Sequence, residues 1–117
     1  SNFNAEQLRQ LVQQASVKPT VVQNWMDPFH QDGAVRALCE ELGIVYQAFS
    51  SMGTQWRHLL RLPNGAQNPV LHHAKLKQMA AARGTSVPSL ILMWLRQLGV
   101  SAIPASRNAG HQKANLE

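Results

Sequence analysis

Apolar positions recur along this chain with two periods, and segments of the two kinds alternate. Residues 5–15, 32–42 and 87–98 carry apolar side chains at spacings of three and four, which predicts amphipathic helices. Short β-branched or aromatic runs at 21–25, 44–49 and 100–103 predict buried strands. Further helices are predicted over 69–84 and, more weakly, from 109 to the end of the chain. Strands that alternate with helices indicate parallel strands in an α/β fold.

The ends of several predicted segments carry their own signals. Asn4 and Ser86 stand where helix N-caps are expected, and Gly43 stands where a C-cap is expected. The segment from Gly53 to Asn68 has no clear period and contains a Pro-Asn-Gly turn signal. We therefore predict a long excursion loop over 54–68, and loops of this length in small domains are often functional.

The number of strands is too small for a closed α/β fold. Only three full strands are predicted, together with the carboxyl end of a fourth at residues 1–3. A complete (β/α)₈ barrel needs about 250 residues, and this chain has 117. We therefore predict a partial TIM (β/α)₈ barrel, about half of one, as a single partial domain over 1–117. Its outer strands would leave unpaired edges.

Composition narrows the class of protein without naming a function. Hydrophobic residues make up 44% and charged residues 15%, which is typical of a globular protein. The sequence has no long apolar run and no basic-then-apolar leader, so we expect a soluble, cytoplasmic protein with no membrane partner. The lone cysteine, Cys39, is expected in the core. The net charge of +5 is dispersed, and this disfavours nucleic-acid binding.

Several residues that attract attention have ordinary interpretations. His72 and His73 are adjacent on a predicted helix, so their side chains diverge by about 100° and cannot share one metal ion. No metal site is therefore predicted. Met79 and Trp94 have the spacing of core residues. Trp56, in the long loop, either covers a substrate pocket or packs the loop against the barrel, and the sequence leaves both open.

Four motifs at the strand ends, in order, resemble those of the aldo-keto reductase superfamily, in the C-terminal half of its barrel. Ser1-Asn2-Phe3 is similar to the end of the family's Gly-(Val/Ile)-Ser-Asn-Phe, and residues 17–23 to its Lys-Pro-x-x-x-Gln strand. Residues 43–53 resemble Gly-Ile-x-x-x-Ala-Tyr-Ser-Pro-Leu-Gly. Residues 103–108, with 115–117, resemble Ile-Pro-Lys-Ser-x-Asn and a following Glu-Asn-Leu. The resemblance covers essentially the whole chain.

The resemblance implies an NAD(P)H-dependent oxidoreductase that reduces aldehydes or ketones by hydride transfer, with this chain supplying the cofactor-binding half. The implied cofactor contacts are Ser1, Asn2 and Gln23 to the nicotinamide amide, Phe49 to the ring face, Ser50, Met52 and Gly53 to the pyrophosphate, Ser106, Arg107 and Asn108 to the 2′-phosphate, and Asn115 to the adenine. Amide side chains suit the first contact because they both donate and accept hydrogen bonds.

Departures from the family pattern bear on the choice of cofactor. The family's phosphate-gripping lysine is Ala105 here, and its arginine is His111. Arg107 can offer a bidentate guanidinium instead. NADP(H) is the implied cofactor, and NAD(H) stays open. Ser51 replaces the usual proline, and Asn24-Trp25 replaces Ile-Glu.

The family's catalytic tyrosine, lysine, aspartate and histidine belong to its N-terminal half, and no residue here matches them. Tyr46, the sole tyrosine, is not expected to substitute. We therefore expect the isolated 117-residue chain to be inactive. The alternative is a non-catalytic half-barrel that binds a dinucleotide or a partner protein. Self-association or pairing with an N-terminal half-barrel are the expected partnerships, and the carbonyl substrate stays unidentified.

Overall fold

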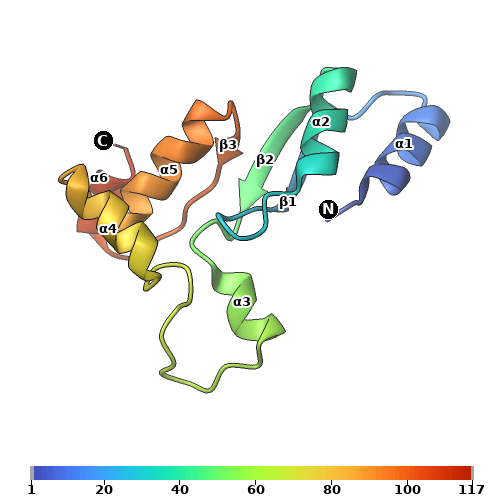
Figure 1. Cartoon of the computed structure of the whole chain (residues 1–117). Helices are drawn as coiled ribbons and strands as arrows, with labels where there is room; N and C mark the ends of the chain where they lie inside the picture. The colour runs from blue at the N-terminus through green and yellow to red at the C-terminus, as the bar shows by residue number, and fades with distance from the viewer. Residues whose placement is uncertain (1, 117) are drawn as a thin grey trace.

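Three parallel strands form the centre of the protein in a computed structural model that describes residues 2–116 (Figure 1). The elements follow the alternating order that the sequence predicts. They are α1 (Ala5–Gln14), β1 (Val21–Trp25), α2 (Gly33–Leu42), β2 (Val45–Phe49), α3 (Thr54–Leu59), α4 (Ala74–Ala82), α5 (Val87–Gln97), β3 (Ser101–Ala102) and α6 (Ala109–Ala114). Figure 1 shows α1 and α2 on the side of β1, and α4, α5 and α6 gathered on the side of β3.

The strands lie side by side in chain order, β1-β2-β3, and both pairs are parallel. Val21 is opposite Val45 and Trp25 is opposite Phe49, so β1 and β2 end at the same level. β3 continues this register with Ser101 opposite Gln47. The parallel α/β arrangement is therefore confirmed, and all three strands point their carboxyl ends to one rim.

The two faces of the sheet have different environments. On β1 and β2 the even-numbered side chains are buried and pack with residues of the helices in one core. The helical part of this core includes Leu8, Val35, Leu38, Ile91 and Leu95. The odd-numbered side chains form what we call the open face, where Val21 is 47% and Val45 is 49% exposed. In a closed barrel, side chains of one of the two alternating sets point inward.

The predicted caps form. Asn4 and Gln7 make a capping box, in which Asn4 Oδ1 accepts from the Gln7 N–H and Gln7 Oε1 accepts from the Asn4 N–H. Gly43 ends α2 with φ +62°, a left-handed conformation that glycine adopts without strain. Ser86 Oγ accepts from the Ser89 N–H at the start of α5. These caps could be predicted from the sequence because each involves neighbours three or four residues apart.

Two predicted segments need correction. The 54–68 excursion is not loop throughout, because α3 occupies its first six residues. The helix predicted from residue 69 begins only at Ala74. The Asn68 side-chain oxygen accepts from the N–H groups of Val70 and Leu71, so residues 69–73 form turns that compete with helix formation.

The last two elements are shorter than predicted. β3 spans only two residues, and Pro104, which follows Ile103, has no N–H to extend the pairing. α6 ends at Ala114, and residue 117, which was predicted to end it, lies outside the described residues.

Three residues were predicted to lie in the core, and one of them is fully buried. Cys39 is 1% exposed, as predicted, and this burial raises the pKa of its thiol. Met79 and Trp94 are only partly buried and line a pocket. Trp94 still packs against the core, so its assignment holds in part, whereas the assignment of Met79 to the core was wrong. No helix among residues 2–116 is long and apolar enough to cross a membrane.

Candidate functional site

A row of polar side chains crosses the open face of the sheet. Gln23 Nε2 donates to Gln47 Oε1 at 2.7 Å, and Gln47 Nε2 donates to Ser101 Oγ at 3.4 Å. The strand register produces this row, because these three residues are directly opposite one another. Gln23 therefore lies on the face that a barrel interior would occupy, together with Gln47, a polar neighbour that sequence reasoning missed.

Asn2 lies along the free edge of β1. Its N–H donates to the Gln23 carbonyl oxygen at 3.3 Å, and its Oδ1 accepts from the Trp25 N–H at 2.9 Å. Asn2 has φ +62°, a left-handed conformation that asparagine tolerates better than most residues. The structure thus brings Asn2 beside Gln23. Ser1, the third predicted nicotinamide contact, lies outside the described residues.

A tight turn follows β2, directly after Phe49. Ser50 and Gly53 have φ values of +54° and +81°, and the Gly53 N–H donates to the Ser50 carbonyl oxygen at 3.0 Å. A Cβ on residue 53 would lie 2.3 Å from Val70 Cγ2, so only glycine fits this close approach. The turn is also held from outside, because Asn68 Nδ2 donates to the Met52 carbonyl oxygen.

This turn and the loop after β3 enclose two neighbouring cavities, of about 200 Å³ and about 510 Å³. Met52, Pro104 and Ala105 line both of them. The smaller cavity is completed by Ser50, Ser51, Thr54, Leu92, Ala102 and Ile103, and the larger one by Leu71, Ser86, Pro88, Ser89, Ser106, His111, Ala114 and Asn115. The structure therefore brings together four predicted contacts, Ser50, Met52, Ser106 and Asn115.

One hydroxyl in the smaller cavity has no partner. Ser51 is 8% exposed, and its Oγ makes no hydrogen bond to any described residue. A buried polar atom without a partner costs about 1–3 kcal/mol, so native structures usually satisfy it with a protein group, water or ligand. Because Ser51 lines the smaller cavity, its hydroxyl is a candidate donor to a ligand there. This residue stands where the resembled family has proline, which has no such donor.

The loop predicted to hold a 2′-phosphate is ordered by its own side chains. Asn108 Oδ1 accepts from the His111 N–H and caps α6, while the Asn108 N–H donates to Ser106 Oγ at 3.1 Å. The Asn108 side chain is therefore engaged as a helix cap. Arg107 is exposed and lines neither cavity. At the position of the family's lysine, Ala105 contributes only a methyl group.

A buried carboxylate fastens α3 to the end of β1. Asp27 is fully buried, and its Oδ2 accepts from Trp25 Nε1 and Trp56 Nε1, both at 2.8 Å. Its Oδ1 accepts from the N–H groups of Phe29 and His30. The rings of Trp25 and Trp56 meet edge-on at 5.3 Å, and Trp25 stacks on His30 at 3.9 Å. Of the two roles left open for Trp56, the structure shows that it packs the excursion against the barrel.

A second polar cluster lies on the opposite, helix-covered face. The Tyr46 hydroxyl and Asn24 Nδ2 both donate to Asp32 Oδ2, at 2.7 and 2.8 Å. Burial, reinforced by this hydrogen bond, raises the pKa of Tyr46 far above its ordinary value. Tyr46 is therefore directed away from the open face. Within residues 2–116, no three His, Cys, Asp or Glu side chains are grouped as metal ligands.

Sequence reasoning missed Asp27 as well as Gln47. Asp27-Pro28 carried only a turn signal, and nothing local connects it to an indole 29 residues away. Gln47 carried a usable signal, since it sits two residues before Phe49 on the same alternating face as that predicted contact.

Comparisons with known proteins agree with this geometry. The model of the "Aldo/keto reductase family" matches residues 1–117. The (1S)-1,7-diacetoxy-luvungin A aldo-keto reductase of Citrus sinensis is 36% identical over 120 residues, and the NADPH-dependent codeinone reductase 1-4 of Papaver somniferum is 33% identical over 117 residues. In both cases the whole chain is aligned, but it spans only 35% of the relative.

Solved structures give the same result. A Bombyx mori aldo-keto reductase in complex with NADP superposes on 99% of the chain with a TM-score of 0.81 and 29% identity. An aldo/keto reductase of Brucella melitensis gives a TM-score of 0.80 at 25% identity. The chain covers 37% and 39% of these two structures. The family model matches the chain along its whole length. The chain therefore belongs to the aldo/keto reductase family.

Proposed function

We propose that this chain is the cofactor-binding half of an NAD(P)H-dependent aldo-keto reductase and that its open face and the two cavities hold NADP(H). The observation that carries the proposal is the convergence of the turn at 50–53 and the loop at 103–106 around the two cavities. This convergence occurs at the carboxyl ends of β2 and β3, where α/β barrels bind their ligands. The Bombyx mori neighbour, whose structure is a complex with NADP, supports the same assignment.

Each part of the site has a distinct role in the proposal. The side-chain amides of Asn2 and Gln23 orient the nicotinamide carboxamide through paired donors and acceptors. The Phe49 ring supports the flat face of the nicotinamide. The hydroxyls of Ser50 and Ser51 hold the pyrophosphate, and the unpartnered Ser51 Oγ has a free proton to donate. When bound, the nicotinamide supplies a hydride, and the protein positions its reactive edge and excludes water.

The loop after β3 sets the choice of cofactor. In the proposal Arg107, which is free of ion pairs among the described residues, turns toward the 2′-phosphate of NADP(H). Ala105 and His111 supply less positive charge than the family pattern does, so NAD(H) is expected to compete.

The carbonyl oxygen is protonated by a group outside residues 2–116, and these residues by themselves are expected to bind cofactor without turnover. The single buried cysteine is consistent with a cytoplasmic protein.

The direct test replaces the unpartnered hydroxyl. Ser51→Ala removes one charge-assisted hydrogen bond, worth about 1.5–3 kcal/mol, so NADPH should bind roughly 10- to 100-fold more weakly by calorimetry. Ser16→Ala, an exposed serine near the end of α1, is the matched control and should leave binding unchanged. Equal affinities for both variants and the parent would overturn this placement of the pyrophosphate. Turnover of an aromatic aldehyde by residues 1–117 alone would overturn the expectation of inactivity.

The open face favours a second candidate function, association through the sheet. Val21 and Val45 expose apolar surface there, and on the outer edge of β1 the residues Asn2 and Phe3 make hydrogen bonds near its carboxyl end. We propose that a second half-barrel covers this face, either another copy or an N-terminal half. Light scattering after size exclusion tests this proposal. A dimer that Val45→Lys dissociates would support association, and a stable monomer would contradict self-association.

A further inference from the structure

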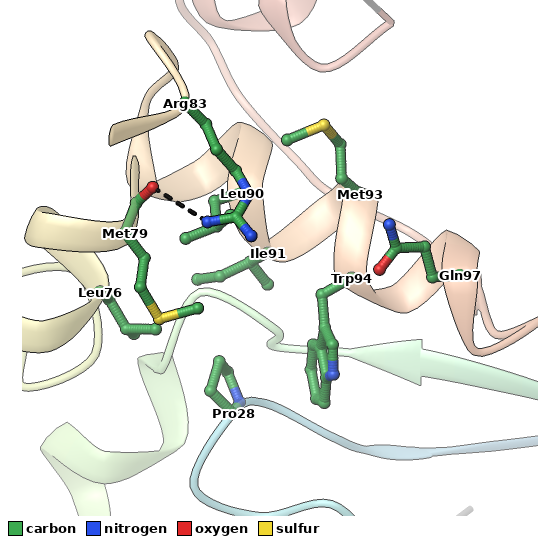
Figure 2. Close-up of a pocket in the computed structure, with 9 residues that line it drawn as sticks. All are labelled: Pro28, Leu76, Met79, Arg83, Leu90, Ile91, Met93, Trp94 and Gln97. Atoms are coloured by element: carbon green, nitrogen blue, oxygen red, sulfur yellow. Dashed lines mark hydrogen bonds between the residues drawn. The ribbon is translucent and has the colours of Figure 1, made fainter. Parts of the chain in front are cut away.

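A separate pocket lies between α4, α5 and the connection from β1 to α2 (Figure 2). Its volume is about 300 Å³. It is lined by Pro28, Leu76, Met79, Arg83, Leu90, Ile91, Met93, Trp94 and Gln97. We call it the α4–α5 pocket. None of these residues lines either proposed cofactor cavity, so the pocket is a distinct site.

The walls of the α4–α5 pocket are almost entirely apolar. Figure 2 shows Leu76 and Met79 reaching from α4, with Leu90 and Ile91 on the facing side of α5. Pro28 and the indole of Trp94 stand at the far end of the same hollow. Small-molecule sites combine such apolar walls with a few polar groups, and typically measure about 300–1,000 Å³. The pocket therefore has the size and lining of a site for a small apolar molecule.

One charged group, the guanidinium of Arg83, lies beside these apolar walls. Figure 2 shows the Arg83 side chain extending from the end of α4 across Leu90 and Ile91. Within residues 2–116 its guanidinium makes one hydrogen bond, a long one of 3.4 Å to the Met79 carbonyl oxygen. A guanidinium has five N–H donors and suits a carboxylate in bidentate geometry. Most of the donors of Arg83 are thus available to an anionic group.

The charges around the pocket also favour an anion. No aspartate or glutamate occurs between Leu42 and Leu116, whereas lysines and arginines recur through α4 and α5. The nearest carboxylate along the chain is Asp27, beside Pro28, and its oxygens already accept four hydrogen bonds from indole and backbone N–H groups. No carboxylate lines the pocket, so none of its lining residues would compete with an acidic ligand for Arg83.

The topology keeps the pocket accessible. It is built from the connection after β1 and from the helices that precede β3, so it flanks the middle strand of the sheet. It lies on the helix-covered side, where Ile91 belongs to the core. A partner that covered the open face or paired with the outer strands would leave it uncovered.

We propose that the α4–α5 pocket binds a small amphipathic carboxylate, with its apolar part among Leu76, Leu90 and Trp94 and its carboxylate on Arg83. At about 30 Å³ per water-sized group, the volume accommodates about ten non-hydrogen atoms. A saturated carboxylate of about eight to ten carbons, which with its two oxygens has about ten to twelve non-hydrogen atoms, matches this size. This site is independent of the proposed cofactor site and adds a second ligand class to the protein.

The four methionines allow the site to be located in the protein without ambiguity. With ¹³C-labelled methionine methyl groups, titration of decanoate should shift the signals of Met79 and Met93, which line the pocket. Met26 is fully buried in the core and Met52 lines the cofactor cavities, so both should stay unshifted. NADPH should instead shift Met52, which separates a failure of this proposal from a failure of the cofactor proposal.

Variants test the role of the charge. Decanoate should bind at least about tenfold more tightly than decanol, because the alcohol lacks the charge-assisted contact to Arg83. Arg83→Gln should abolish that preference while decanol binding persists, and Arg83→Lys should retain most of it. Lys77→Gln, an exposed cation on α4 outside the lining, is the matched control and should behave as the parent.

Three results would overturn the proposal. Decanoate that shifts no methionine signal, or that shifts Met52 instead, would show that the pocket is not its site. Equal affinity for decanoate and decanol would show that Arg83 does not select an anion. An unchanged preference in Arg83→Gln would transfer the selection to another group.

Discussion

The indole N–H of Trp56 donates a 2.8 Å hydrogen bond to Asp27 Oδ2, although the two residues are 29 positions apart. Asp27 also receives the Trp25 indole, so one buried carboxylate joins the end of β1 to the helix that follows β2. Since Trp25 is in register with Phe49, this bond sets the position of α3 relative to the proposed nicotinamide platform. The short helix in the excursion therefore depends on a distant partner.

Asp27→Asn tests this link. The asparagine amide has the shape of the carboxylate but only one acceptor oxygen. Its NH₂ group would face N–H donors of an indole or the backbone, and those buried donors would lose their acceptor. We expect the free energy of unfolding to fall by about 2–3 kcal/mol, with red-shifted Trp56 fluorescence. Urea denaturation followed by tryptophan emission measures both. Glu41→Gln, at an exposed carboxylate in a 3.8 Å pair with Arg9, should change little, and an equal loss there would contradict the special role of Asp27.

Gly53→Ala tests the close approach behind the pyrophosphate turn. The new Cβ meets both a φ of +81° and the Val70 side chain. We expect a loss of at least about 2 kcal/mol in stability, from backbone strain together with overpacking. Gly84→Ala is the matched control, because its φ is +63° but no atom lies within 4 Å of the new Cβ. Thermal denaturation should rank Gly53→Ala as clearly worse, and equal losses in the two variants would contradict the role of the Val70 contact.

Ala105→Lys tests the choice of cofactor. It adds a cation at the edge of both cavities, where the resembled family has lysine, so the affinity for NADPH should rise about tenfold relative to NADH. Ala81→Lys adds the same charge on the exposed side of α4 and should leave the ratio unchanged. The two dissociation constants, measured at one salt concentration, decide the matter. A ratio that moves equally in both variants would indicate only a general charge effect.

The Tyr46–Asp32 hydrogen bond should make stability sensitive to alkaline pH. The pKa of Tyr46 is raised above its ordinary value of 10.0, first by burial and then by the Asp32 hydrogen bond. The unfolded chain therefore releases this proton above pH 10 while the folded protein keeps it, so stability falls as the pH rises. The slope attributable to Tyr46 approaches about 1.4 kcal/mol per pH unit.

Urea denaturation between pH 8 and pH 11 measures this effect. Tyr46→Phe should be less stable than the parent at pH 8, since Asp32 loses a donor, but the gap should narrow above pH 10. Taking the difference between the two proteins removes the contributions of groups that both proteins share. Parallel curves for the two proteins would show that Tyr46 does not stay protonated in the fold.

Local signals predicted most of the fold. The Asn4 N-cap, the Gly43 C-cap and the strand periods each involve residues a few positions apart, so the sequence alone was sufficient to predict them. α3 was missed because its stability comes from Asp27, a partner whose position follows only from the packed sheet. The late start of α4 depends on Asn68, whose side chain captures backbone N–H groups that a helix would use.

The candidate site divides in the same way. Gln23, Phe49 and the turn at 50–53 were predicted through motif resemblance. Among the described residues, Asn2 lies beside Gln23, and Ser50, Met52, Ser106 and Asn115 line the two cavities, whereas Arg107 lines neither and the Asn108 side chain caps α6. Gln47 became part of the candidate site only because the register of β1 with β2 places it opposite Gln23. The Ser51 hydroxyl became a candidate ligand contact because it is buried without a hydrogen-bond partner, and no sequence pattern indicates that property.

The nicotinamide ring on Phe49 is the central claim, and a magnetisation-transfer measurement tests it most directly. With labelled phenylalanine rings and bound NADP⁺, nuclear Overhauser effects should join the nicotinamide ring protons to Phe49. Phe29, which is 45% exposed and contacts His73, provides the internal comparison and should show none. Effects confined to Phe49 are the predicted result. Bound NADP⁺ whose nicotinamide protons show no effect to Phe49 would contradict the account.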